Sequence, residues 1–160
     1  MDRAERVGQL LLARGWRVSI AESTAGGLIS AALLKVAGAS RYYERGIVAY
    51  SRAAKIDTLG MPSSLYTAQG SVHREAVKAM AEGVRRLSNA QVGVAESGVA
   101  GPGAGGSGLP IGTVWAAVVT PERELQRELH LPGNRGEVME GIVERVLEIL
   151  EEALTPSQSA

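Results

Sequence analysis

The segment 38–55, which reads GASRYYERGIVAYSRAAK, contains serine, tyrosine and lysine residues that could do chemistry together. The chain has only three lysines against fourteen arginines, and one of them, Lys55, ends this segment. An arginine stays protonated in proteins, whereas a buried lysine can lose its proton and act as a base. Ser40, Tyr50, Ser51 and Lys55 could therefore form a group that activates a hydroxyl nucleophile. The alternative is an ordinary exposed lysine that follows an ordinary strand.

A second segment with binding chemistry is the glycine-rich stretch 96–108, ESGVAGPGAGGSG. It has neither the GxxxxGK[ST] spacing of a Walker loop nor the GxGxxG spacing of a dinucleotide-binding turn. A connection of this length is usually functional, and glycines let backbone N–H groups approach an anion closely. We expect a monophosphate or a carboxylate here, with Arg135 supplying the matching charge. The alternative is a flexible crossover between two strands.

A third polar turn, AESTAGG at 21–27, stands directly before an expected helix. The first turn of a helix has unpaired N–H groups and the positive end of the helix dipole, which together suit an anion. Ser23 and Thr24 are also good helix N-cap residues, and capping alone would explain them. His73 falls at the start of a later helix, where a cap is again the simplest role.

The apolar pattern indicates how these three segments are positioned. Helical periodicity predicts helices at 2–13, 28–36, 74–87 and 137–154, and short apolar or alternating runs predict strands at 16–20, 46–50, 91–95, 113–119 and 122–131. Helices between strands, followed by two adjacent strands that pair in antiparallel fashion, favour an α/β fold: a three-layer α/β/α sandwich with a mixed, mostly parallel sheet. The polar loops 21–27, 51–55 and 96–108 each follow a predicted strand, which is where such sheets bind ligands.

Length and composition limit the remaining possibilities. We expect one domain over residues 1–160, with 155–160 as a frayed tail. The 17 basic and 17 acidic residues balance, so no direct contact with nucleic acid or a membrane surface is expected. The chain has no cysteine and two distant histidines, so we expect neither a metal site nor a cofactor. The N-terminus lacks the pattern of a signal peptide, so we expect a cytoplasmic protein.

Four motifs carry a resemblance to a known family. AESTAGG (21–27), ERGIVAYSRAAK (44–55), SGVAGPGAGG (97–106) and PIGTVWAAV (110–118), in this order, resemble the CinA C-terminal domain family, the competence/damage-inducible protein domains that act as bacterial nicotinamide mononucleotide deamidases. The resemblance implies a three-layer α/β/α fold and metal-free hydrolysis of nicotinamide mononucleotide to nicotinic acid mononucleotide and ammonia. Many relatives carry a separate pyrophosphatase-like domain before this one, and that second activity is not expected here.

The same resemblance assigns roles to individual residues. It places the serine nucleophile on Ser40, the lysine base on Lys55, and a strand-end tyrosine on Tyr50. Either backbone N–H groups of a glycine loop or the hydroxyls of Tyr50 and Ser97 would hold the oxyanion. The family more often has threonine at the position of Ser97. The 5′-phosphate would be bound by Ser23, Gly26, Gly98, Gly101, Gly103 and Arg135.

Two further positions depart from the family pattern. The family usually reads AESCTGG where this chain has AESTAGG, so Ala25 lacks the second hydroxyl. His73 stands where relatives commonly carry a small hydroxyl residue. The altered AESTAGG motif supports an alternative function, a phosphate-ligand-binding or regulatory module without turnover, whereas the departure at His73 has no explanation in the sequence. A third possibility is an interaction partner in DNA uptake or repair.

The spacing of Ser40 and Lys55 poses a geometric condition. The strand predicted at 46–50 lies between them and spans roughly 13–17 Å at about 3.3 Å per residue. The two side chains can meet only if a flanking segment folds back or if Lys55 reaches a neighbouring subunit. The spacing leads us to expect a homo-oligomer, with a dimer that shares its site as one arrangement. The small-molecule substrate, nicotinamide mononucleotide, is what the resemblance implies.

Overall fold

Five strands form one mixed sheet in the order β2-β1-β3-β4-β5, in a computed structural model that describes residues 1–157. The strands are β1 (Val18–Glu22), β2 (Tyr43–Val48), β3 (Val92–Gly98), β4 (Thr113–Val119) and β5 (Glu124–His130). Strand β1 pairs in parallel with β2 and β3, whereas β3 with β4 and β4 with β5 are antiparallel. The expected mixed sheet is confirmed, but the expectation that it is mostly parallel is wrong, since two of its four strand pairings are antiparallel.

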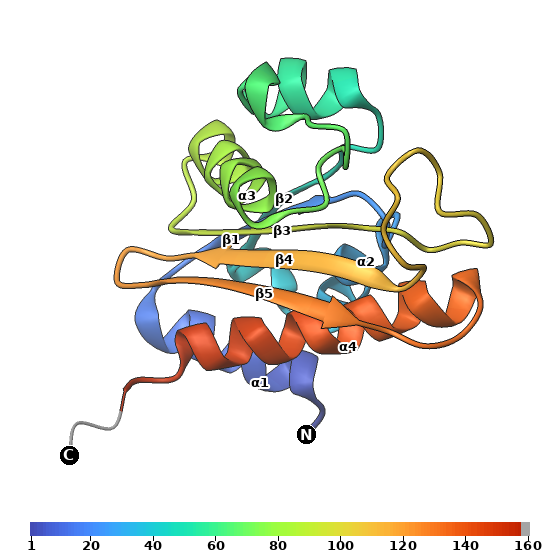
Figure 1. The fold of residues 1–160 in the computed structure, drawn as a ribbon. Coiled ribbons are helices and arrows are strands. Elements are labelled where there is room, and N and C mark those ends of the chain that lie inside the picture. The colour runs from blue at the N-terminus through green and yellow to red at the C-terminus, as the bar shows by residue number, and fades with distance from the viewer. Residues whose placement is uncertain (158–160) are drawn as a thin grey trace.

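Helices cover both faces of this sheet. Helices α1 (Arg3–Arg14), α2 (Leu28–Leu34) and α4 (Arg135–Leu154) pack on one face, and α3 (Arg74–Ser88) packs on the other, above the sheet in Figure 1. Two separate apolar clusters fill the spaces between the layers, one on each side of the sheet. The predicted three-layer α/β/α sandwich is therefore confirmed.

Local sequence sets the ends of the longer helices. Asp2 and Asn134 each accept a hydrogen bond from the backbone N–H three residues later and so begin α1 and α4. His73 begins α3: its Nδ1 accepts from the N–H of Ala76 at 3.4 Å, and its Nε2 lies 2.7 Å from the carbonyl oxygen of Leu65. The capping role expected for His73 is confirmed.

Strand β2 begins three residues earlier than the apolar pattern predicts. Residues Tyr43, Glu44 and Arg45 belong to it although two of them are charged and exposed. β2 is an edge strand, so part of its surface faces solvent and polar side chains are compatible with it. An apolar run is therefore not required there.

The parallel strands direct their carboxyl ends to one edge of the sheet, where three loops gather. Those loops follow β1, β2 and β3 and carry the polar segments 21–27, 51–55 and 96–108. Helix α4 ends at Leu154, and the expected frayed tail at 155–160 falls partly on 158–160, outside the described residues. No helix within residues 1–157 has the length and apolar character needed to cross a bilayer.

Candidate active site

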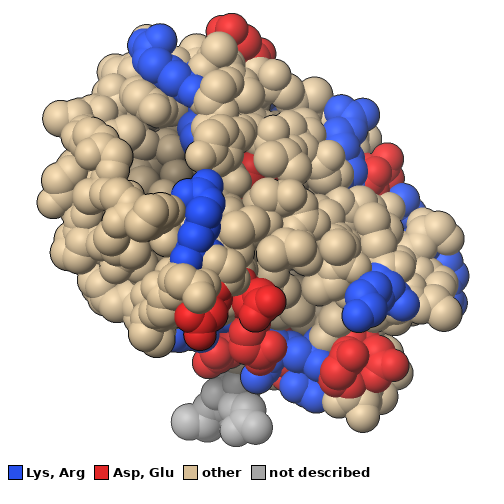
Figure 2. Space-filling model, turned by 90° about the vertical axis from the view of Figure 1, so that its right-hand side faces the viewer, with Lys and Arg blue, Asp and Glu red and all other residues tan. Residues whose placement is uncertain are grey.

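A pocket of about 510 Å³ opens at the carboxyl ends of β1 and β3. All three predicted loops line it, through residues of segments 23–24 and 97–107 and through Tyr50 and Lys55. A fourth segment, 66–72, completes the wall, and the sequence pattern alone did not mark it. Figure 2 looks at the end of the molecule where the glycine-rich loop lies and shows a hollow in largely uncharged surface with basic side chains beside it.

Lys55 has the environment that a lysine needs in order to act as a general base. It lies in the helical turn Ala54–Thr58 with only 4% of its surface exposed. Its Nζ donates a hydrogen bond to the carbonyl oxygen of Tyr50 at 2.8 Å. Burial lowers the pKa of the Lys55 amine, and the negative charge of Glu96 opposes that shift. A lysine that loses its proton more readily and opens into a pocket can accept a proton from a substrate or a neighbouring hydroxyl.

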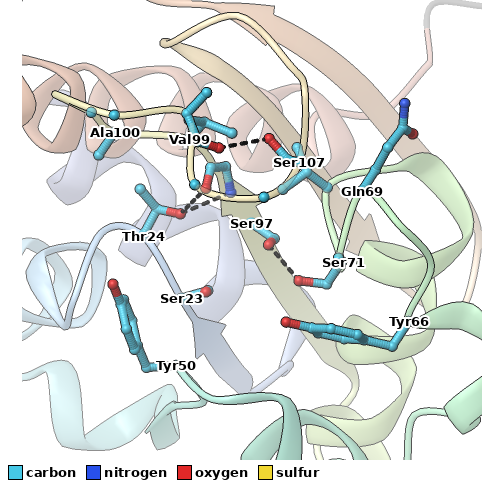
Figure 3. A pocket seen from close by; sticks show the side chains of 18 of the residues that line it. Ser23, Thr24, Tyr50, Tyr66, Gln69, Ser71, Ser97, Val99, Ala100 and Ser107 are labelled. Atoms are coloured by element: carbon cyan, nitrogen blue, oxygen red, sulfur yellow. Dashed lines mark hydrogen bonds between the residues drawn. The ribbon is translucent and has the colours of Figure 1, made fainter.

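Ser23 supplies a hydroxyl to the same pocket as Lys55. The N–H of Ala49 donates to the carbonyl oxygen of Glu22 at 2.8 Å, so the chain that leads to Tyr50 runs alongside Ser23. The Ser23 side chain makes no hydrogen bond to any of residues 1–157, although the residue is only 5% exposed. In Figure 3 it lies on the pocket floor between Tyr50 and Ser97.

Ser97 lies on the other side of Ser23 and is bonded differently. Continuing the β1–β3 register from the pair Ala21 and Ala95 places Ser23 beside Ser97. The Ser97 hydroxyl lies 2.7 Å from the hydroxyl of Ser71, which precedes α3, and both side chains are buried (Figure 3). Ser71 was not predicted, because nothing in the run before a helix cap distinguishes a pocket hydroxyl from a surface one.

Thr24 joins the first and third loops. Its Oγ1 accepts from the N–H of Gly98 at 2.8 Å and donates to the carbonyl oxygen of Gly98 at 3.1 Å. This paired contact appears in Figure 3 between the turn after β1 and the end of β3. The Thr24 hydroxyl of the AESTAGG motif therefore connects two loops by hydrogen bonds. Ala25 contributes its backbone N–H, which donates to Glu96.

Two buried glutamates occupy the N–H groups that were expected to bind a phosphate. Glu22 accepts three hydrogen bonds, from the N–H groups of Gly27, Ile29 and Ser30, at 2.8–3.1 Å. The first turn of α2 thus already holds a carboxylate of the protein itself. Gly26 is exposed and does not line the pocket. The phosphate role expected of Ser23 and Gly26 at this helix end is therefore wrong, since no free donor array is left there.

Glu96 is the second of these acids and is fully buried. Its Oε1 accepts from the N–H of Ser23 at 2.7 Å and from the N–H of Ala25 at 2.8 Å. Burial raises the pKa of Glu96 to about 7, and the charge of Glu22 adds to the shift, while the two N–H bonds oppose it. In the sequence, Glu96 stands out only as the first residue of a glycine-rich loop.

The lining of the pocket carries basic side chains and no acidic one within residues 1–157. Lys55 and Arg135 are the only Lys, Arg, Asp or Glu side chains that line it among residues 1–157. Arg135 donates from Nη1 to the carbonyl oxygen of Gly101 at 2.8 Å and from Nη2 to the hydroxyl of Tyr50 at 3.4 Å. Gly98, Gly101 and Gly103 also line the pocket, so an anion bound here would meet a guanidinium and a glycine-rich backbone.

Ser40 lies at the opposite end of the sheet. It belongs to the short turn Ala39–Arg41 before β2, is exposed, and does not line the pocket. Its carbonyl oxygen accepts from Arg17, which precedes β1, and the six residues of β2 add roughly 20 Å between Ser40 and the pocket edge. Of the two arrangements left open for Ser40 and Lys55, a meeting within one subunit is excluded, because the segment between them does not fold back.

Ser51 supports the turn of Lys55 without entering the pocket. It is exposed, and its hydroxyl accepts a hydrogen bond from the N–H of Ala54 at 3.0 Å. Among residues 1–157, no three His, Cys, Asp or Glu side chains gather in a group that could hold a metal ion.

The sequence of this chain is similar to a known protein family and to several named relatives. The model of the CinA C-terminal domain matches residues 1–154. A nicotinamide-nucleotide amidohydrolase PncC from Enterobacter agglomerans is 45% identical over 109 residues, 68% of this chain and 66% of that protein. A CinA-like protein from Anaeromyxobacter dehalogenans is 40% identical over 90% of this chain but only 35% of its own length. The chain thus spans about a third of the length of several curated relatives.

Solved structures agree with these matches. The crystal structure of the competence damage-inducible protein A (ComA) from Klebsiella pneumoniae superposes with a TM-score of 0.91 at 33% identity. The superposition covers 95% of this chain and 94% of that one. The similarity therefore extends over nearly the whole sandwich.

Proposed function

Because the chain belongs to the CinA C-terminal domain family, we propose that its pocket hydrolyses the carboxamide of nicotinamide mononucleotide. The products are nicotinic acid mononucleotide and ammonia. One relative carries the name nicotinamide-nucleotide amidohydrolase, which supports this substrate class. The observation that carries the proposal is Lys55, a buried amine with a lowered pKa that lines a pocket rich in hydroxyl groups.

Ser23 is the nucleophile that the geometry favours. It lines the pocket, its hydroxyl has no partner within residues 1–157, and its backbone is held by Glu96. Lys55 donates a hydrogen bond to the carbonyl oxygen of Tyr50. The segment that leads to Tyr50 is itself hydrogen-bonded to Glu22, the residue before Ser23. Ser40, in contrast, is exposed at the opposite end of the sheet and does not line the pocket. A serine needs an adjacent base to attack an amide, and Lys55 is the basic side chain on this side of the pocket.

The reaction then proceeds in two steps. The neutral amine of Lys55 takes the hydroxyl proton of Ser23 while Ser23 Oγ bonds to the carboxamide carbon, and the carbonyl oxygen gains the negative charge. When the C–N bond breaks, Lys55 returns that proton to the leaving nitrogen, which departs as ammonia. Water attacks the resulting ester with Lys55 again as base, and the proton passes to Ser23 Oγ as the acid is released.

The remaining pocket groups would bind the rest of the substrate. The Ser97 hydroxyl, held by Ser71, is a donor for the oxyanion. Arg135 and the N–H groups of the glycine-rich loop would bind the 5′-phosphate, since they line the same pocket. A nucleotide with one phosphate suits a site that has a single guanidinium beside the pocket.

The direct test is ammonia release from nicotinamide mononucleotide by purified protein. We expect turnover, and we expect Lys55→Met to reduce kcat by about 10³-fold or more because the base is lost. Ser40→Ala is the matched control and should leave the rate unchanged. Binding of the nucleotide without ammonia release would favour the alternative of a ligand-binding module. A large loss in Ser40→Ala would instead indicate a nucleophile donated by a second subunit.

A further inference from the structure

The tripeptide Ala-Glu-Ser occurs twice, at the ends of two neighbouring parallel strands. Residues 21–23 include the last two residues of β1 and the one after it, and residues 95–97 lie just before Gly98, the last residue of β3. Ala21 pairs directly with Ala95. Side chains alternate between the faces of a sheet, so the two serines lie together on one face and the two glutamates on the other. Both glutamates are buried, Glu22 at 1% exposure and Glu96 at 0%.

Only one of these acids has both carboxylate oxygens satisfied. Glu22 uses both oxygens to accept N–H groups from the start of α2. Glu96 accepts two N–H groups on Oε1, whereas its Oε2 is buried and has no hydrogen-bond partner among residues 1–157. A buried, half-satisfied carboxyl group is unfavourable unless it has a compensating role.

The groups that Glu96 holds are those that carry the proposed nucleophile. Its Oε1 lies 2.7 Å from the N of Ser23 and 2.8 Å from the N of Ala25, so both ends of the Ser23–Ala25 turn rest on one oxygen atom. Glu22 is already saturated by α2 and cannot replace it. The position of the Ser23 hydroxyl therefore depends on the acceptor that Glu96 provides.

We propose that Glu96 is a positioning residue of the amidase reaction: it fixes the Ser23 turn and, through its charge, sets the pH range in which Lys55 is a neutral base. This inference rests on the proposed function and deepens it. Glu96 does not line the pocket and so acts through Ser23 and Lys55 rather than on the substrate.

The charge relations define the expected pH dependence. The titratable groups that interact with Glu96 are Glu22 on β1 and Lys55 in the turn Ala54–Thr58. The charge of Glu22 and burial together raise the pKa of Glu96 and keep its carboxyl protonated up to neutral pH. Once ionised, Glu96 raises the pKa of Lys55, so the lysine loses its proton at a higher pH than it would beside a neutral group.

Glu96→Gln separates the charge from the geometry. The amide oxygen can still accept both N–H groups, so kcat at high pH should stay within about threefold of wild type. Without the negative charge, the acidic limb of kcat/KM should move to lower pH by about one unit. Glu96→Ala removes the acceptor, and we expect kcat to fall by about 10²-fold with little change in KM, because the turn shifts.

Controls distinguish this inference from the proposed function. Glu140→Gln removes an exposed carboxylate of α4 and should leave the pH profile unmoved. An active wild type whose profile is identical to that of Glu96→Gln would overturn the role of Glu96 alone. If the wild type releases no ammonia, the proposed function has failed and the positioning role fails with it. If Glu96→Ala does not fold, Glu96→Gln still decides the matter through its pH profile.

A second measurement does not depend on activity. The raised pKa of Glu96 means that the folded state binds a proton more tightly than the unfolded chain. Its contribution to stability is fully present below the unfolded pKa of about 4.5 and is lost as the pH rises through about 7. The melting temperature of the wild type should therefore fall relative to that of Glu96→Gln over this range. A constant difference would contradict the titration of Glu96.

Discussion

The ends of β1 and β3 carry the same tripeptide but use it in opposite ways. At the end of β1, Glu22 is saturated by three backbone N–H groups, and the Ser23 hydroxyl has no partner within residues 1–157. At the end of β3, Glu96 has one oxygen without a partner in the same described part of the chain, and Ser97 is bonded to Ser71. The end of β1 thus combines a glutamate that holds the start of α2 with a serine whose hydroxyl has no partner in the described residues. The end of β3 combines a glutamate that titrates near neutral pH with a serine that is hydrogen-bonded to Ser71.

The difference comes from the segment that each strand leads into. After β1 the chain turns through Gly26 and Gly27 directly into α2, whose first N–H groups lie within reach of Glu22. After β3 it enters a glycine-rich loop that leads to the antiparallel strand β4, so no helix begins there. Glu96 therefore finds its donors on the neighbouring turn and couples the two strand ends. Identical residues on adjacent strands acquire different roles through connectivity alone.

The largest effect should come from exchanging the two serines for alanine. Ser23→Ala removes the proposed nucleophile and should reduce kcat for ammonia release by about 10⁴-fold. Ser97→Ala removes one proposed oxyanion donor and should reduce kcat by about 10²-fold. Steady-state kinetics of both variants, with melting temperatures to show that they fold, measure the contrast. Equal losses in the two variants would contradict the division of roles between the strand ends.

The two glutamates should differ in their contribution to stability. Glu22→Gln replaces an oxygen that accepts backbone N–H groups with an NH₂ group, which should destabilise the fold by about 2 kcal/mol. Glu96→Gln at pH 7 keeps its acceptor and removes a partly ionised buried charge, so its effect should be smaller. Urea unfolding at pH 7 measures both changes. A larger loss in Glu96→Gln would reverse the assignment of the structural acid.

Arg135 tests whether the glycine-rich loop after β3 binds the substrate phosphate while Ser23 and Lys55 carry out the covalent steps. Arg135→Ala removes the guanidinium beside Gly101 and should raise KM by about tenfold, with kcat changed little. Arg127→Ala, which removes a surface arginine paired with Glu152, is the matched control. If kcat falls while KM stays constant, Arg135 acts in the reaction itself, and the proposed division is wrong.

Much of the fold could be predicted because each element has a local cause. Asp2 and Gly15 bound the first helix, and the alternation in the segment 124–130 identifies β5 as a half-exposed antiparallel strand. The convergence of loops 21–27, 51–55 and 96–108 was also predictable, since parallel strands end at a common edge. These inferences need only periodicity and strand direction.

The details of the site depend on contacts between distant segments, which periodicity does not contain. Glu96 bonds to Ser23 and Ala25, more than seventy positions away along the chain, and Ser71 meets Ser97 from the start of α3. Ser40 was assigned by motif, and its place at the far end of β2 agrees with the strand direction that the sequence already indicated. For that residue, the length of the intervening strand was a better guide than the motif.

The smallest expected effect concerns the contact that makes Ser97 differ from Ser23. Ser71→Ala removes the hydroxyl 2.7 Å from Ser97 and leaves Ser97 with only the pocket as a source of partners. We expect a loss of about 1 kcal/mol in unfolding free energy and a change in kcat within about threefold, since Ser97 keeps its place on β3. Ser63→Ala, at an exposed hydroxyl, controls for the substitution itself. If Ser71→Ala lost turnover as fully as Ser23→Ala, the hydroxyl pair at the end of β3 would belong to the proton path. The two strand ends would then share the chemistry rather than divide it.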